Sequence, residues 1–444
     1  MYLSGAFIFF NGILSAILGL TVKCLVNEPG ESHLASPIVT MLAYCTAMAG
    51  MGLAGYLSHR IRRKNSLLPA MAEGDMMKHA AQGCLALGIL VQLLTLFGNH
   101  ASGSILSVLR QLNYFTLMAI LLATVYEVRR TGGTRSTNWV VFIGGIWLFC
   151  FGLVGFSKEG MFTPLVLWLL PSIAMGYNFS KKQLIVGAFV VLFGFYYLVP
   201  YSQVVRNFRS ENNSLLEDIH TAEFYLSDLK ETRKLYLVSA ENGDDYESAP
   251  HFYRESQGLF DRLEMLAYDD ALITVTDQGT PFGLGPVYFT YINIVPHFLW
   301  PSKPTIGFGN VFAHEIGVLA ENDETTGISF SPVGEAYHEA AWWGVGLLLP
   351  GIVFLLFLVT DSLAGDVRIS PWGFLPISVA VNVAPEGGLT GAISMTTYGA
   401  VVLILVALLS RYVFPLLWPL VIGGSRTRVR PTMNFDRIAS TRKP

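Results

Sequence analysis

About ten apolar stretches of roughly 20 residues each constrain the fold of this chain more than any other feature. A helix of that length crosses the hydrocarbon core of a bilayer while satisfying its own backbone polar groups. Only 14% of the residues are charged, against about 25% in soluble domains. The sequence therefore predicts an all-α polytopic membrane protein with transmembrane helices near residues 2–22, 36–57, 80–98, 104–126, 138–156, 161–179, 183–200, 341–360, 373–392 and 396–419.

The distribution of basic residues predicts how these spans are oriented. Cytoplasmic loops carry an excess of Lys and Arg, and every even-numbered span is followed by such residues. They are Arg60, Arg62, Arg63 and Lys64, then Arg129, Arg130 and Arg135, then Lys181 and Lys182, then Arg368, and finally Arg426, Arg428, Arg430, Arg437, Arg442 and Lys443. The first stretch lacks a basic n-region and a cleavage site, so we interpret it as a retained span. The pattern predicts ten spans with both termini cytoplasmic.

One large segment, residues 201–331, separates the seventh span from the eighth and is predicted to lie on the outer side. It holds 8 basic and 20 acidic residues, whereas the rest of the chain holds 21 basic and 12 acidic residues. The predicted domains are a bundle at 1–200, an extracytoplasmic loop domain of helical and irregular structure at 201–331, a bundle at 332–422 and a basic cytoplasmic tail at 423–444.

Within the outer segment, apolar residues at helical spacing predict amphipathic helices at Ser214–Leu237 and Leu259–Val275. The stretch 276–310 is rich in Gly, Pro and aromatic residues, which predicts irregular backbone near the membrane surface. Ser331 followed by Pro332 is typical of a helix start. We expect that helix to run into the eighth span.

Several classes of site are not indicated by the sequence. The four cysteines, Cys24, Cys45, Cys84 and Cys150, form no CxxC or Cys/His metal spacing. No phosphate-binding glycine loop is present, and nucleotide-dependent chemistry is not expected on the outer side of a membrane. No basic patch interleaved with aromatics suggests nucleic acid. We therefore expect no cofactor, no metal and no nucleic-acid partner.

Cations in or near the predicted outer face are candidate ligands for an anionic group. Arg206 and Arg209 stand at i, i+3 after the seventh span, where on a helix they would share one face. The full set is Lys158, Arg206, Arg209, Arg262, His297 and Lys303. Arg forks match phosphate oxygens with two parallel hydrogen bonds. Each residue alone could equally be a solvated charge or part of a salt bridge.

Arg110 lies inside the fourth span, where a central Arg costs about 2.5–3.5 kcal/mol on insertion scales. It could contact an anion from the bundle interior, or it could snorkel near the outer end of its span. Glu386 lies in a Gly-rich context, which fits either a broken helix around a cavity or a short outer loop.

Acid–base candidates occur in the sequence SPVGEAYHEAAWWG. Glu335, His338 and Glu339 fall at i, i+3 and i+4, so one helical face would present them together near the outer surface. A carboxylate beside an imidazole can act as a general base or orient one. The alternative is a polar helix start anchored by Trp342 and Trp343. The pair His314–Glu315 lacks the spacing of a zinc protease.

Several of these arrangements resemble the Wzy-type O-antigen or oligosaccharide repeat-unit polymerases. The run IVPHFLWPSKP is similar to the family's Ile-Pro-Arg-x-x-Trp-Pro-x-Lys-Pro, and SPVGEAYHEAAWWGVG to its Gly-Glu-x-Tyr-x-Asn-Phe-Gly-x-x-Gly. Lys158 in FSKEG stands where the family often has Ser-Arg or Ser-Lys. The resemblance covers residues 255–350. Two positions depart from it: His297 replaces the usual Arg, and His338–Glu339–Ala340 replaces the Tyr-x-Asn-Phe neighbourhood.

The resemblance implies a metal-independent membrane glycosyltransferase in the bacterial cytoplasmic membrane. Its substrates would be undecaprenyl-diphosphate-linked oligosaccharides, joined on the outer face into a surface polysaccharide or exopolysaccharide. Arg206, Arg209 and Arg262 would stabilise the departing diphosphate, with Lys158, His297, Lys303 and Arg110 assisting. Glu335 or His338 would be the base. Partners would include membrane lipid and, in such a pathway, a flippase and a chain-length regulator.

Other functions remain open at this stage. A ligase with the same lipid-linked donor would transfer the finished glycan to a different acceptor. A polysaccharide transporter or flippase should show repeat symmetry and polar residues spread through several spans, and neither feature is visible. A non-enzymatic scaffold of an export complex is a further possibility.

Overall fold

The structure, a computed structural model, describes residues 1–71, 73–97, 105–206, 215–242, 250–255, 257, 260–295, 299–300, 302–304, 306–324 and 326–421. All regular secondary structure within these ranges is helical. Seven helices are long and apolar enough to cross a membrane: Leu3–Leu25, Pro37–Ile61, Asp75–Leu96, Val108–Thr131, Lys181–Arg206, Pro332–Ala364 and Gly388–Trp418. The prediction of a polytopic, all-α membrane protein is therefore confirmed.

Helices occupy all ten stretches predicted to span the membrane. Three of them, α7, α8 and α19, have 16, 17 and 13 residues, so the number of spans stays a prediction. The helices of the bundle are α1 (Leu3–Gly12), α2 (Leu18–Leu25), α3 (Pro37–Ile61), α4 (Asp75–Phe97), α5 (Ile105–Leu112), α6 (Phe115–Thr131), α7 (Trp139–Val154), α8 (Lys158–Ala174), α9 (Lys181–Phe193), α10 (Val199–Arg206), α17 (Pro332–Trp343), α18 (Leu349–Ala364), α19 (Phe374–Glu386), α20 (Gly388–Leu408) and α21 (Phe414–Val421).

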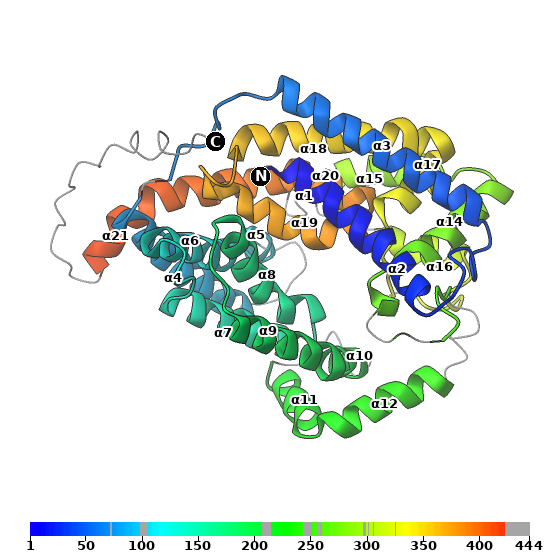
Figure 1. Cartoon of the computed structure of the whole chain (residues 1–444), viewed down its shortest axis with the longest axis horizontal. Helices are drawn as coiled ribbons and strands as arrows, with labels where there is room; N and C mark the ends of the chain where they lie inside the picture. The colour runs from blue at the N-terminus through cyan, green and yellow to red at the C-terminus, as the bar shows by residue number, and fades with distance from the viewer. Residues whose placement is uncertain are drawn as a thin grey trace.

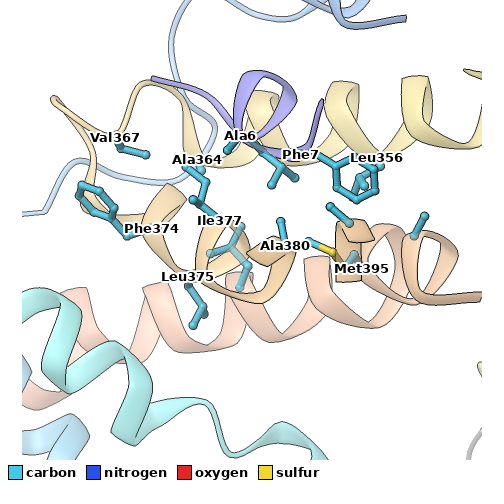
Figure 2. Close-up of a cluster of buried hydrophobic side chains, with 14 of the residues drawn as sticks. Ala6, Phe7, Leu356, Ala364, Val367, Phe374, Leu375, Ile377, Ala380 and Met395 are labelled. Carbon is cyan, nitrogen blue, oxygen red and sulfur yellow. The ribbon is translucent and has the colours of Figure 1, made fainter. Parts of the chain in front are cut away.

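The helices form two groups that lie side by side in Figure 1. One contains α1, α3 and α17–α20, and the other contains α4–α10. Figure 2 shows the core of the first group, where Phe7 of α1, Leu356 of α18, Ile377 of α19 and Met395 of α20 meet. Alanines such as Ala380 lie among them, fully buried. Small residues let helix backbones approach closely, which is how membrane helices gain packing energy.

Two of the predicted spans are interrupted in the structure. The predicted ninth span ends at residue 392, but α19 ends at Glu386 and α20 begins at Gly388, which has φ +59°. Only glycine adopts this left-handed backbone readily, and it allows the two helices to meet in a tight turn. The predicted fourth span is likewise interrupted at residues 113–114, between α5 and α6.

The outer segment contains α11 (Leu215–Ser227), α12 (Leu229–Asn242), α14 (Leu266–Gln278), α15 (Gly285–Asn293) and α16 (Phe308–Glu315). The first predicted amphipathic helix is thus two helices, and the second begins later than expected. The prediction of irregular backbone across 276–310 is wrong where α15 forms. In Figure 1, α14, α16 and α17 gather at the same end as α2, whereas α11 and α12 lie beside α10.

Four acidic side chains tie these parts together by accepting hydrogen bonds at helix starts. Asp361 accepts from the backbone N–H of Leu3 at α1 (2.9 Å), and Asp270 from those of Ala35 and Ser36 before α3 (2.6 and 3.2 Å). Asp269 and Glu335 do the same for α17 and α20, as described below. The first N–H groups of a helix have no intrahelical partner and carry partial positive charge. Each acid therefore satisfies backbone donors at or just before the start of a helix.

Candidate functional site

The first turn of α17 is held by a polar cluster that reaches two other helices, α14 and α3. The Ser331 hydroxyl accepts from the N–H groups of Val333 and Gly334 (3.0 and 3.2 Å), which confirms the predicted helix start. Ser331 donates its own N–H and hydroxyl to Asp269 of α14, and Tyr44 of α3 donates to the same carboxylate. Burial raises the pKa of Asp269 to about 6, while the hydrogen bonds from Ser331 and Tyr44 oppose that shift.

The helix α17 is broken at Ala340 and Ala341. Ala340 has φ −147° and ψ 22°, and Ala341 has φ 49° and ψ −133°. The break leaves the carbonyl groups of His338 and Glu339 without intrahelical partners, and the N–H groups of Phe282 and Gly283 donate to them (2.9 and 3.0 Å). Non-helical backbone at membrane depth is tolerated only where protein satisfies it in this way. The loop between α14 and α15 thus supplies the hydrogen-bond donors for the carbonyl groups at the break in α17.

Glu335, a predicted catalytic residue, is partly buried on the face of α17 toward α20. Its carboxylate accepts the N–H of Leu389 (2.7 Å) in the first turn of α20. A Cβ on Gly388 would lie 2.2 Å from that carboxylate, so glycine is required for the approach. Glu339, one turn further along, is 2% exposed, and its Oε2 atom has no hydrogen-bond partner among the described residues. The structure therefore gives Glu335 a capping contact, and its role as base stays a prediction.

His338 faces the other side of α17 and is 1% exposed. Its Nδ1 lies 2.8 Å from the hydroxyl of Thr276 on α14. Its Nε2 lies 3.0 Å from a carboxylate oxygen of Glu315 at the end of α16, within ion-pair distance although not aligned as a hydrogen bond. The rings of Phe282 and Phe312 lie against the imidazole, with centroids at 5.4 and 4.7 Å. The Glu315 side chain is 34% exposed, so the pair connects a buried imidazole with the surface.

The predicted cations fall into three groups. Arg110 on α5 and Arg206 at the end of α10 have exposed side chains, so Arg110 does not point into the bundle interior. Lys303 is 7% exposed and donates to the carbonyl oxygens of Asn293 and Val295 (3.3 and 2.8 Å), so its ammonium group holds the end of α15. Burial lowers the pKa of Lys303. Arg209, His297 and the side chain of Arg262 lie outside the described part of the structure.

Lys158 begins α8 beside Glu159, and both lie near the turn between α19 and α20. Glu159 interacts electrostatically with Glu386 and Lys158. Tyr114, which precedes α6, is within electrostatic range of Glu159 and of Tyr398 on α20. This mixed cluster lies where the two groups of helices meet, since α8 packs against α19 there. Glu386 is therefore the last residue of α19, at the short turn that leads into α20.

Sequence reasoning missed three residues of the site. Asp269 was visible only as one member of an acidic pair, Thr276 carried no motif, and Glu315 lacked a metal-protease spacing. Their partners lie 62, 62 and 23 residues away in the chain, so no local pattern could have indicated them.

Comparisons of the chain with models of known protein families, with curated proteins and with solved structures find no match. The fold and site therefore define the class: a polytopic α-helical membrane protein with a broken helix and a cluster of acidic and imidazole side chains at one end of its bundle. No group of three or more metal-ligating side chains is found among the residues that the structure describes.

Proposed function

We propose that this protein is a membrane glycosyltransferase of the Wzy type, which joins polyprenyl-diphosphate-linked oligosaccharide repeat units. The observation that carries the proposal is a contact between two segments within residues 255–350, the region that the resemblance covers. The N–H groups of Phe282 and Gly283 donate to the carbonyls of His338 and Glu339 across more than 50 residues of chain. Both stretches thus contribute to one polar site at the entrance to a membrane helix.

The proposed topology has ten spans, cytoplasmic termini and the outer segment on the far side of a bacterial cytoplasmic membrane. The structure supports it by gathering predicted cytoplasmic groups at one end. The amine of Met1 pairs with Asp366 (2.9 Å), and Arg129 donates to the carbonyl of Arg368 (2.8 Å). Asp270 and Asp269 belong to the outer segment and contact the N-terminal ends of α3 and α17, away from these predicted cytoplasmic groups.

In the proposed reaction, the departing prenyl diphosphate needs positive charge aimed at its developing negative charge. Arg206 is exposed at the end of α10 and is the best-placed described candidate. Arg209 and Arg262 are proposed to act with it, and Lys158 is proposed to assist. Lys303 is assigned a supporting role because its ammonium group is already bound to backbone carbonyls. The acceptor hydroxyl needs positioning and a base, which the site around α17 can provide.

Deleting the gene and analysing the lipid-linked glycans on a gel tests this proposal. Accumulated single repeat units would support the polymerase, whereas accumulated long chains would identify the rival ligase. In the complemented strain, Arg206→Ala should abolish polymer at an unchanged protein level, while Lys234→Ala should not. Lys234 is a suitable control because it is an exposed cation of the outer segment, paired with Glu231 (3.1 Å). Normal chain-length ladders from Arg206→Ala would refute the diphosphate role.

A transporter is the second candidate, because α17 is broken and carries Glu335 and Glu339 beside the break. Broken helices with intramembrane acids are typical of transporter substrate sites. Proteoliposomes distinguish the two functions. Polymer formed from a defined lipid-linked oligosaccharide, with the substrate present on both faces, requires an enzyme. Movement of the unaltered substrate between leaflets would instead indicate transport.

A further inference from the structure

The pair Glu315–His338 places two proton acceptors next to each other. Thr276 has a single hydroxyl proton, and its oxygen lies 2.8 Å both from the carbonyl of Leu272, four residues earlier, and from His338 Nδ1. The carbonyl can only accept, so the hydroxyl donates to it, and Nδ1 must then carry a proton and donate to the hydroxyl oxygen. This tautomer is assigned from the hydrogen-bond pattern.

The consequence concerns the other ring nitrogen. In a neutral imidazole with a proton on Nδ1, Nε2 is an acceptor, and Glu315 Oε2 lies 3.0 Å from it. Two acceptors at that distance repel each other unless a proton lies between them. With the carboxylate ionised and the imidazole neutral, the pair therefore has an affinity for one added proton. Because His338 is buried, Glu315 is the only residue of the pair that solvent or a substrate can reach.

We propose that Glu315 is the general base of the glycosyl transfer and that His338 is its positioning residue. This inference rests on the proposed function and specifies the base in it. The Glu315 carboxylate takes the proton of the acceptor hydroxyl as that oxygen forms its bond to the anomeric carbon of the donor. The bond from this carbon to the diphosphate oxygen breaks, and its electron pair leaves with the prenyl diphosphate. The proton then lies between Glu315 and His338 Nε2.

The surroundings suit a proton-accepting pair. The other ionisable side chains on the elements packed around it are Tyr268, Asp269, Asp270 and Asp277 on α14, His314 on α16, and Glu335, Tyr337 and Glu339 on α17. Tyr337 donates to Asp277 (3.4 Å), and His314 Nε2 lies 2.9 Å from the carbonyl of Asp323. Burial raises the pKa of Glu315, which makes its carboxylate a stronger base. Phe282 and Phe312 keep water from the imidazole.

The test uses the full-length protein in proteoliposomes with a defined polyprenyl-diphosphate oligosaccharide. Glu315→Gln keeps the shape of the side chain and removes its proton affinity, so the initial rate of transfer should fall about 10²- to 10⁴-fold. Donor binding, measured by retention of labelled lipid-linked oligosaccharide, should be unchanged. Glu315→Asp should restore part of the rate. Glu321→Gln, at an exposed acid six residues further along, serves as the matched control.

The pH profile separates a base from a structural contact. The wild-type rate should fall as pH drops and the pair gains its proton, whereas the residual rate of Glu315→Gln should lack that limb. His338→Gln, which can still reach Glu315, should move the limb on the pH axis. A transfer rate for Glu315→Gln within threefold of an active wild type, or an unchanged acid limb, overturns the assignment. A wild type that forms no polymer refutes the proposed function instead.

Discussion

The break in α17 places a non-glycine residue in strained backbone, and this leads to a prediction with an unusual sign. Ala341 has φ 49° and ψ −133°, a region that only glycine enters without steric cost. A residue held there stores roughly 1–3 kcal/mol. Replacing it with glycine also raises the entropy of the unfolded chain, which costs about 0.4–1 kcal/mol. We therefore expect Ala341→Gly to stabilise the protein, by up to about 2.6 kcal/mol.

The neighbouring residue provides a matched control. Ala340 has φ −147°, which any residue adopts, so Ala340→Gly carries the entropic cost without relief of strain and should destabilise the protein by about 0.4–1 kcal/mol. Both variants remove one methyl group from adjacent half-buried positions. Unfolding of the purified protein in mixed micelles with increasing denaturant would measure the two free energies. Equal destabilisation by both substitutions would show that Ala341 is not strained.

Three further predictions concern packing, pH and topology. Gly344→Ala should abolish accumulation of folded protein on size-exclusion chromatography, because its Cβ would lie 1.6 Å from the carbonyl oxygen of Ala336, whereas Gly346→Ala, with open space around it, should not. Burial raises the pKa of Glu264 to about 8, above its usual value near 4.3. Its contribution to the free energy of unfolding is therefore full below pH ~4.3 and lost as pH rises through about 8. Glu264→Gln should reduce this loss of stability, by at most about 5 kcal/mol. An equally steep loss of stability with pH in the variant would contradict the raised pKa. In a background without native cysteines, Glu321→Cys should react with an impermeant maleimide in intact cells and Thr134→Cys only after lysis; the reverse labelling would invert the proposed topology.

The coarse architecture could be predicted from the sequence because its signals are local. Hydrophobic stretches located most of the bundle helices, and the Ser331–Pro332 pair located the start of α17. The breaks could not be predicted in the same way. Residues 113–114 and the turn at Gly387–Gly388 lie inside apolar runs, and the turn depends on Glu335, which approaches from another helix.

The candidate site was predicted in part for the same reason. Helical spacing indicated that Glu335, His338 and Glu339 belong together, but it could not show that Glu335 faces α20 while His338 faces α14 and α16. Asp269 and Asp270 are adjacent in sequence and were unremarkable there. In the structure they accept hydrogen bonds before two different helices, α17 and α3. Sequence neighbours thus acquire separate roles through long-range contacts.

These contacts make the outer segment part of the bundle rather than a separate domain beside it. Met265 donates to the carbonyl of Ser15 in the π-helical turn of the first span (3.0 Å), and Phe282 and Gly283 satisfy the carbonyls freed by the break in α17. An unsatisfied backbone group within a bilayer costs several kcal/mol. The membrane helices therefore depend on the segment from α14 to α15 for their broken and bulged turns, and that segment depends on the helix starts of α3 and α17 for its buried acids. Phe282 and Gly283 belong to the outer segment, and their N–H groups bind the carbonyls at the break in α17. A movement of the outer segment on substrate binding would consequently change these hydrogen bonds and the backbone of α17 at the break.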